Sequence, residues 1–246
     1  MRKYILAVDL GQSNDHTAII GLRRGDAARL DCIGIDRLPL GMSYPDQVEH
    51  IVGLARRGDL ADDCMVAVDA TGVGAAVVDL LRPRVSPAPF YAVTITAGDT
   101  MTRDGRKWRV PKRDLIGAAQ VALQQRRVKL PRVSAEAATL VEELNGYRVT
   151  IGVNGHDTYG NDWRQAPHDD LVLALAIGIY VADTTVGHEA RLEMARGRIP
   201  PLGTRGMRAP IPAWQQKHLR QRLGHAVPSL AAASTGQGPE VRRLAL

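Results

Sequence analysis

The start of the chain contains three short segments rich in apolar and β-branched residues, separated by polar turns. Residues 3–9 form an almost continuous apolar segment that ends at Asp9, a pattern typical of a buried strand. Residues 11–15 are glycine and small polar residues, which favour a turn. Residues 17–22 and 31–38 predict two further strands, the second with the alternation of a more exposed strand. Three consecutive strands with short connections predict an antiparallel meander.

Strands and helices alternate in the next part of the chain. A helix is expected from Pro45, with its apolar residues at helical spacing. These residues are Val48, Ile51, Val52 and Leu54. Residues 64–68 predict a short strand that ends at Asp69, residues 75–81 predict a helix and residues 90–95 another strand. Strand–helix alternation after a run of strands indicates a mixed α/β fold, with about five or six strands in one sheet and helices covering its parallel centre.

The segment over residues 97–110 is polar, basic and glycine-containing. Its composition favours a loop or hairpin, with Trp108 as a buried hairpin anchor. A helix is expected to begin at Pro111, and residues 128–130 favour a short extended piece.

The following part predicts one capped helix and one strand. Ser134 is an N-cap residue for a helix that runs to Leu144. Residues 147–153 predict a strand, and the Asn-Gly pair at 154–155 is typical of a hairpin turn.

The most apolar helix of the chain is predicted after Asp169 and Asp170. Residues 171–182 carry no charge, which indicates a helix buried on most sides. Beyond residue 185 the composition changes, because residues 186–246 contain ten Lys or Arg against three Glu together with many Pro, Gly and Ser. We expect one domain over residues 1–185 and a basic, largely disordered tail with one short candidate helix at 213–223.

Composition excludes several classes of protein. The chain has 246 residues, of which 45% are hydrophobic and 4% aromatic, so aliphatic side chains must fill an ordinary core. No segment approaches the roughly 18 apolar residues of a membrane span, and the start has no signal-peptide layout. Cys32 and Cys64 form neither a metal cluster nor a disulfide framework, so we expect a reducing cytoplasm and no membrane partner.

The positive charge is gathered in clusters. The net charge is +6, and the residues of two short stretches account for much of it. The first stretch holds Arg103, Arg106, Lys107, Arg109, Lys112 and Arg113, and the second holds Arg126, Arg127, Lys129 and Arg132. Clustered Lys and Arg neutralise phosphates, so we expect the first stretch to bind DNA.

Four acidic residues share one unusual placement. Asp9 and Asp69 each end an apolar strand, and Asp169 and Asp170 open an apolar helix. Charges at the rim of hydrophobic elements are costly unless something compensates them. If the two strands are neighbours, their carboxylates meet at the edge where open α/β sheets build their sites. Converged carboxylates favour Mg²⁺ or Mn²⁺, and two such ions can cleave a phosphodiester.

Each acid also has a purely structural alternative. Asp9 could cap the turn that follows it, and Asp69 could brace the turn into the next helix. Asp169 could be a helix-start residue favoured by the helix dipole, and His168 is expected to be a turn or capping residue. The shared placement of all four acids favours a common site.

Three segments resemble a known family. They are residues 7–18 (AVDLGQSNDHTA), 68–74 (VDATGVG) and 168–176 (HDDLVLALA), with weaker support from 111–116 (PKRDLI) and 142–144 (EEL). In this order they resemble the C-terminal nuclease domain of the terminase large subunit of tailed phages, over about residues 4–183.

The resemblance implies an RNase H-like fold and cleavage of double-stranded DNA by two metal ions, Mg²⁺ or Mn²⁺. It implies Asp9, Asp69 and one or both of Asp169 and Asp170 as metal ligands, with a slight preference for Asp170. The chain has no G-x-x-x-x-G-K-[ST] motif, which a packaging ATPase would need. The partners that the resemblance implies are therefore a separate packaging ATPase, a small terminase subunit or a portal.

Three other functions fit parts of the same pattern. A Holliday-junction resolvase or related RNase H-like nuclease shares the chemistry and differs in DNA structure. A small-molecule kinase of the actin-like superfamily has similar phosphate loops, which residues 8–13 and 69–74 resemble, but it needs two such domains. A DNA-binding remnant without catalysis would result if the metal site were incomplete.

Overall fold

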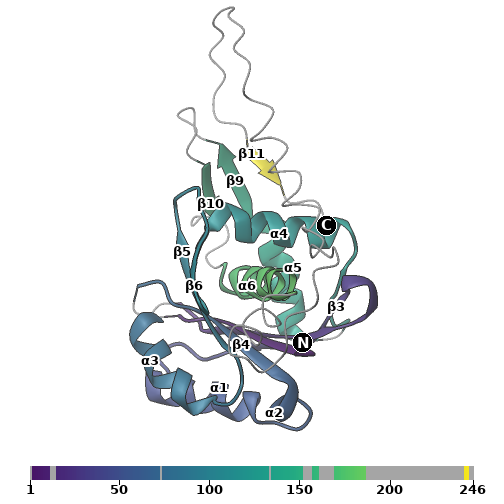
Figure 1. Cartoon of the computed structure of the whole chain (residues 1–246). Helices are drawn as coiled ribbons and strands as arrows, with labels where there is room; N and C mark the ends of the chain where they lie inside the picture. Colours follow the sequence, from purple (N-terminus) through teal and green to yellow (C-terminus); the bar gives the residue numbers. More distant parts are fainter. Residues whose placement is uncertain are drawn as a thin grey trace, which may run out of the picture.

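The computed structural model describes residues 2–11, 15–72, 74–132, 134–151, 157–160, 169–186 and 241–243. Its centre is a mixed sheet of eight strands in the order β6-β7-β5-β4-β1-β2-β3-β8 (Figure 1). The strands are β1 (Tyr4–Asp9), β2 (Ala18–Arg24), β3 (Leu30–Arg37), β4 (Cys64–Asp69), β5 (Phe90–Thr96), β6 (Thr102–Asp104), β7 (Lys107–Pro111) and β8 (Val128–Lys129).

The sheet is antiparallel on one side and parallel on the other. β1, β2 and β3 form the expected meander, whereas β1, β4, β5 and β7 run parallel. The prediction of a mixed α/β sheet is therefore confirmed, but the predicted number of strands was too low. The basic segment supplies β6 and β7, and the short piece after it becomes β8.

Two sets of helices cover the two faces of the sheet. The helices α1 (Tyr44–Ala55), α2 (Leu60–Asp63) and α3 (Gly74–Arg84) lie on one side (Figure 1). The helices α4 (Lys112–Gln124), α5 (Ala135–Gly146) and α6 (Asp170–Thr185) lie on the other. A short 3-10 helix, Asp26–Ala28, joins β2 to β3. Alternate residues of each strand point to the two faces, and they enter two separate hydrophobic cores.

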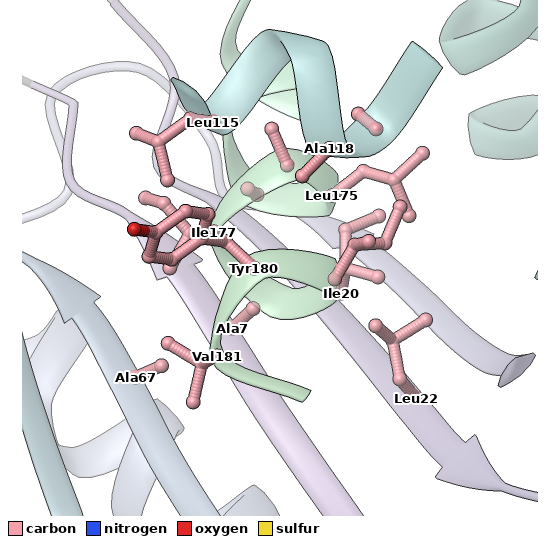
Figure 2. Packing of buried hydrophobic residues seen from close by; sticks show 14 of the residues in the cluster. Ala7, Ile20, Leu22, Ala67, Leu115, Ala118, Leu175, Ile177, Tyr180 and Val181 are labelled. Atoms are coloured by element: carbon pink, nitrogen blue, oxygen red, sulfur yellow. The ribbon is translucent and has the colours of Figure 1, made fainter. Parts of the chain in front are cut away.

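The apolar helix α6 lies between the sheet and α4. Figure 2 shows Leu115 and Ala118 of α4 on one side of it and Ala7 and Ile20 of the sheet on the other. A Cβ atom on Gly178 would lie only 2.8 Å from Leu22 Cδ1 and 3.0 Å from Ala7 Cβ. The absence of a side chain at this position thus allows α6 to approach β1 and β2 closely. Burial on most sides, predicted from the uncharged sequence, is confirmed.

The end of α6 is held by two arginines. Arg127 donates to both carboxylate oxygens of Asp183, at 3.1 and 2.6 Å. Arg24 donates to the carbonyl oxygen of Ala182 at 2.7 Å, which satisfies a carbonyl that the helix end leaves open. Arg127 belongs to the second basic stretch of the sequence, but its guanidinium is engaged inside the fold.

The basic segment over residues 97–110 is a β-hairpin of β6 and β7. Trp108 is 1% exposed, and its ring meets the Tyr91 ring edge-on at 4.8 Å between centroids. The predicted role of Trp108 as a buried anchor is confirmed. Pro111 ends β7, and α4 begins one residue later than the predicted helix.

A small second sheet contains β9 (Arg148–Ile151), β10 (Asp157–Gly160) and β11 (Val241–Arg243) in the order β10-β9-β11. The predicted turn at 154–155 and the candidate helix at 213–223 lie outside the described residues, as does His168. So does most of the predicted tail over 186–246. None of the described helices has the length and apolar character needed to cross a membrane.

Candidate active site

Asp9 and Asp69 end two neighbouring parallel strands. Val8 of β1 pairs with Val68 of β4, so the residue after each lies at the same edge of the sheet. Strand alternation places Asp9 with Ala7 and Asp69 with Ala67, on the face covered by α6. The charge of Asp69 is among the causes that raise the pKa of Asp9, as expected of two carboxyl groups that lie close together. The prediction that Asp9 and Asp69 end adjacent strands is confirmed.

The loop after β4 fixes the Asp69 side chain. Asp69 Oδ1 accepts hydrogen bonds from the backbone N–H of Thr71 at 2.8 Å and from its hydroxyl at 2.5 Å. The same hydroxyl accepts from the N–H of Ile95 at 2.9 Å, which ties the loop to β5. A Cβ atom on Gly74 would lie 2.5 Å from the Asp69 carbonyl oxygen, so the turn into α3 requires glycine. Asp69 therefore braces this turn, as its structural alternative predicts, and also faces Asp9.

Gly11, Thr17 and Gln47 hold the turn after β1 through hydrogen bonds. The N–H of Gly11 donates to Thr17 Oγ1 at 3.0 Å, and that hydroxyl donates to Gln47 Oε1 at 2.8 Å. A Cβ atom on Gly11 would lie 2.2 Å from the carbonyl oxygen of Asp15. The close turn thus depends on Gly11 and Thr17.

Asp169 and Asp170 enter the site differently. Asp170 is the first residue of α6 and is 7% exposed. Its Oδ2 lies 3.6 Å from Arg37 Nη2, at the end of β3. Asp169 precedes the helix, and its Oδ2 accepts a hydrogen bond from Lys112 Nζ at 3.2 Å. Each acid of the pair is therefore matched with its own basic residue.

Glu143 of α5 also belongs to this cluster. It is 6% exposed, and its Oε2 accepts hydrogen bonds from the N–H groups of Leu171 at 3.0 Å and Val172 at 3.2 Å. Burial raises the pKa of Glu143 to about 7, and the charge of Asp170 adds to that rise. Sequence reasoning assigned no role to Glu143 or to Arg37. The available signal was the position of Glu143 three residues after Leu140, on the buried face of α5.

The acids raise one another's proton affinity. Burial raises the pKa of Asp9 well above its ordinary value, and repulsion by Asp69, Asp170 and Asp169 adds to the rise. Burial also raises the pKa of Asp69, although its hydrogen bonds from Thr71 oppose the shift. Ionised at neutral pH, the cluster would hold several close negative charges, and a cation would relieve their repulsion.

The donor chemistry of the cluster fits a hard divalent cation. Carboxylate oxygens are the ligands that Mg²⁺ and Mn²⁺ prefer. Within the described residues, however, no three acidic, histidine or cysteine side chains are already gathered tightly enough to hold an ion. Asp169 and Asp170 instead contact Lys112 and Arg37. Metal binding would require these carboxylates to move from the basic partners toward Asp9 and Asp69.

The six predicted DNA-binding residues do not all lie on the same face of the sheet as the acids. Lys112 begins α4 at the same edge as the acids and contacts Asp169. Lys107 and Arg109 alternate along β7 with the buried Trp108 and Val110, so they project from the opposite face of the sheet.

Of the other three predicted residues, Arg103 and Arg106 belong to the β6–β7 hairpin and Arg113 is the second residue of α4. Arg103 stands over the Trp108 ring at 5.0 Å from its centroid. Arg106 stands over the Tyr91 ring at 5.7 Å. Arg113 donates to Asp99 Oδ1 at 2.5 Å.

Comparisons with known proteins bear on the fold. The sequence matches no known protein-family profile and no curated protein. Among solved structures, the large terminase nuclease from the thermophilic phage G20c superposes with a TM-score of 0.53 and 20% identity. The match covers 73% of this chain and 82% of that one. At this level of similarity the two proteins share the fold, and the predicted RNase H-like fold is confirmed.

Two further large terminases are similar at lower scores. The g2p (large terminase) nuclease domain of bacteriophage SPP1, solved with bound Mn, has a TM-score of 0.46 and 8% identity, over 72% of this chain and 85% of that one. The HK97 bacteriophage large terminase has a TM-score of 0.46 and 13% identity, over 73% of this chain and 39% of that one.

Proposed function

We propose that this chain is a metal-dependent nuclease that hydrolyses phosphodiester bonds of double-stranded DNA, as the nuclease part of a phage DNA-packaging terminase. The observation that carries the proposal is the convergence of Asp9, Asp69 and Asp170 at one edge of the sheet. Two of them end paired parallel strands, and the third begins the buried helix above them. The shared fold with a large terminase nuclease supports the same function.

Asp9, Asp69, Asp170 and Asp169 are the proposed ligands of two Mg²⁺ or Mn²⁺ ions. When bound, such a pair activates a water molecule and stabilises the leaving oxygen of the phosphodiester. The protein's own part is to bring the carboxylates to one edge of the sheet and to orient Asp69. Thr71 orients Asp69 through two hydrogen bonds, and burial under α6 limits the access of bulk water to Asp9.

The basic residues around the acids are proposed to hold the DNA backbone. Lys112 lies beside Asp169, where its ammonium group can contact a phosphate next to the bond that is cut. Arg113 and Arg103 extend the positive charge toward the β6–β7 hairpin. Lys107 and Arg109 can contact only a duplex that passes around this edge of the sheet, because they project from the other face. Contacts of this kind position DNA without reading its sequence.

A plasmid-nicking assay with Mn²⁺, Mg²⁺ or EDTA tests the proposal. We expect the wild type to cut supercoiled plasmid with either ion and not with EDTA. Asp9→Asn and Asp69→Asn should each abolish cutting and keep DNA binding, whereas Asp59→Asn, at an exposed position, should cut normally. Cleavage by the double variant Asp9→Asn, Asp69→Asn would contradict the assignment.

Two added substrates separate the competing functions. A four-way junction cut in preference to linear duplex would point to a resolvase. ATP binding measured by equilibrium dialysis, together with no cleavage of any DNA, would point to the actin-like kinase function.

A further inference from the structure

The N-terminus of α6 is capped in an unusual way. An aspartate at the N-cap position ordinarily accepts a hydrogen bond from the N–H two or three residues later. Asp169 holds this position, but its side chain makes no such bond. The same chain shows the ordinary arrangement elsewhere, since Ser134 accepts from the N–H of Ala137 at 3.0 Å and Ser43 from that of Asp46 at 3.3 Å.

The capping bonds of α6 come from another helix. Leu171 and Val172 are the second and third residues of α6, and their N–H groups are the ones that an N-cap side chain normally engages. Both donate to Glu143 Oε2, at 3.0 and 3.2 Å. Glu143 lies on α5, between buried Leu140 and Leu144, so it is anchored in the core.

We infer that Glu143 is a positioning residue for Asp169. By occupying the free N–H groups of α6, it prevents the Asp169 carboxylate from folding back onto its own helix. That carboxylate instead faces Lys112, at 3.2 Å, and the edge of the sheet where Asp9 and Asp69 lie. The inference rests on the proposed function, in which Asp169 serves a bound cation.

Without Glu143, we expect the Asp169 carboxylate to cap its own helix. Without Glu143, two N–H groups at the positive end of α6 would lack a partner, and buried donors without a partner are costly. Asp169 stands at the N-cap position, from which a side chain ordinarily reaches these groups, and the helix dipole favours its charge there. A glutamine at 143 would preserve the acceptor oxygen, whereas an aspartate would keep the charge but shorten the side chain by one methylene.

Isothermal titration of the full chain with MnCl₂ tests the inference. We expect Glu143→Ala to weaken Mn²⁺ binding about ten-fold, the size of effect seen when support for a ligand is removed. Glu143→Asp should weaken it similarly, and Glu143→Gln should stay near the wild type. In an Asp169→Asn background, Glu143→Ala should cause no further loss, because the ligand it positions is already gone.

Ser43→Ala is the matched control. It removes the cap of α1, on the far side of the sheet, so it should lower thermal stability and leave the Mn²⁺ affinity unchanged. If Glu143→Ala does not fold, Glu143→Asp and Glu143→Gln still give the comparison.

Two outcomes would overturn the inference. Wild-type Mn²⁺ affinity in a folded Glu143→Ala or Glu143→Asp variant would leave the proposed function intact and refute the role of Glu143. The same would follow if the losses from Glu143→Ala and Asp169→Asn simply added. A wild type that binds no Mn²⁺ would refute the proposed function and the inference together.

Discussion

Lys112 Nζ lies 3.2 Å from Asp169 Oδ2, which joins the first residue of α4 to the residue just before α6. In the proposed nuclease a metal ion needs the same carboxylate. Lys112 therefore competes with the cation, and the cation must displace it. Once displaced, the ammonium group is free to contact a phosphate of the DNA.

Lys112→Gln should tighten Mn²⁺ binding and weaken DNA binding. The side chains of Lys112 and Asp169 are 27% and 25% exposed. An ion pair of this kind contributes about 0.2–1 kcal/mol of interaction free energy. Its removal should therefore raise the Mn²⁺ affinity by at most about five-fold. Calorimetry gives the metal affinity, and the salt dependence of DNA binding should become shallower by about one unit for one lost phosphate contact.

Lys107→Gln serves as the control, since Lys107 projects from the opposite face of the sheet. It should leave the Mn²⁺ affinity unchanged. Weaker Mn²⁺ binding by Lys112→Gln would show that Lys112 supports the metal site instead of competing with it.

Asp9→Asn should stabilise the protein in EDTA at neutral and mildly alkaline pH. The folded-state pKa of Asp9 is raised, so folding favours its protonated form, and this stabilisation is lost as the pH rises through the folded pKa. The variant should therefore unfold at higher denaturant than the wild type at about pH 8, by about 1 kcal/mol, with an advantage that shrinks toward about pH 5.

Mn²⁺ should reverse this order. At about 100 times its dissociation constant, it should stabilise the wild type by about 2.7 kcal/mol and the variant much less. A variant that is less stable than the wild type in EDTA at about pH 8 would argue against charge repulsion in the cluster.

Gly178→Ala should destabilise the fold by about 1–3 kcal/mol, because the added methyl group would collide with Leu22 and Ala7. Gly117→Ala is the counterpart in α4, where a Cβ atom would meet no atom within 4 Å. The second change should stabilise the protein by about 0.5–1 kcal/mol. Urea unfolding compares the two, and equal effects would contradict the close contact of α6 with the sheet.

Arg127→Ala should cost about 3 kcal/mol of unfolding free energy. It would leave the buried carboxylate of Asp183, whose side chain is 10% exposed, without its bidentate partner. Arg23→Ala removes an ion pair to Asp31 in which the arginine is 46% exposed, and should cost less than about 1 kcal/mol. Similar losses from both changes, measured by thermal unfolding, would contradict the structural role given to Arg127.

Local patterns were sufficient to predict where Asp9, Asp69 and Asp170 stand in the fold. Asp9 and Asp69 each close an apolar strand, and the uncharged helix after Asp170 requires a buried position, so their common edge followed from strand topology. That the two acids end neighbouring strands depends on the register of β1 against β4, which is set by long-range pairing and not by either segment.

Other parts of the site have only a weak local signal. Glu143 sits in a pair of glutamates that is typical of a solvent-exposed helix face, and only α6 reveals its partner. The residues of the β6–β7 hairpin have the composition of a loop, because their strand character comes from pairing with β5. The face from which Lys107 projects follows from strand alternation with the buried Trp108, and the expectation of a loop or hairpin did not fix that alternation.

The position of α6 late in the sequence also determines when the acids can come together during synthesis. β1 leaves the ribosome long before α6, because Asp9 and Asp170 stand near opposite ends of the described domain. At roughly 5–20 residues per second, the interval is on the order of ten to thirty seconds. During synthesis the strands that carry Asp9 and Asp69 can pair, but they lack the helix that covers them and brings Asp170. A nascent chain of the proposed nuclease therefore cannot bring its acids together until the domain is nearly complete, so it cannot act on DNA before the fold is finished.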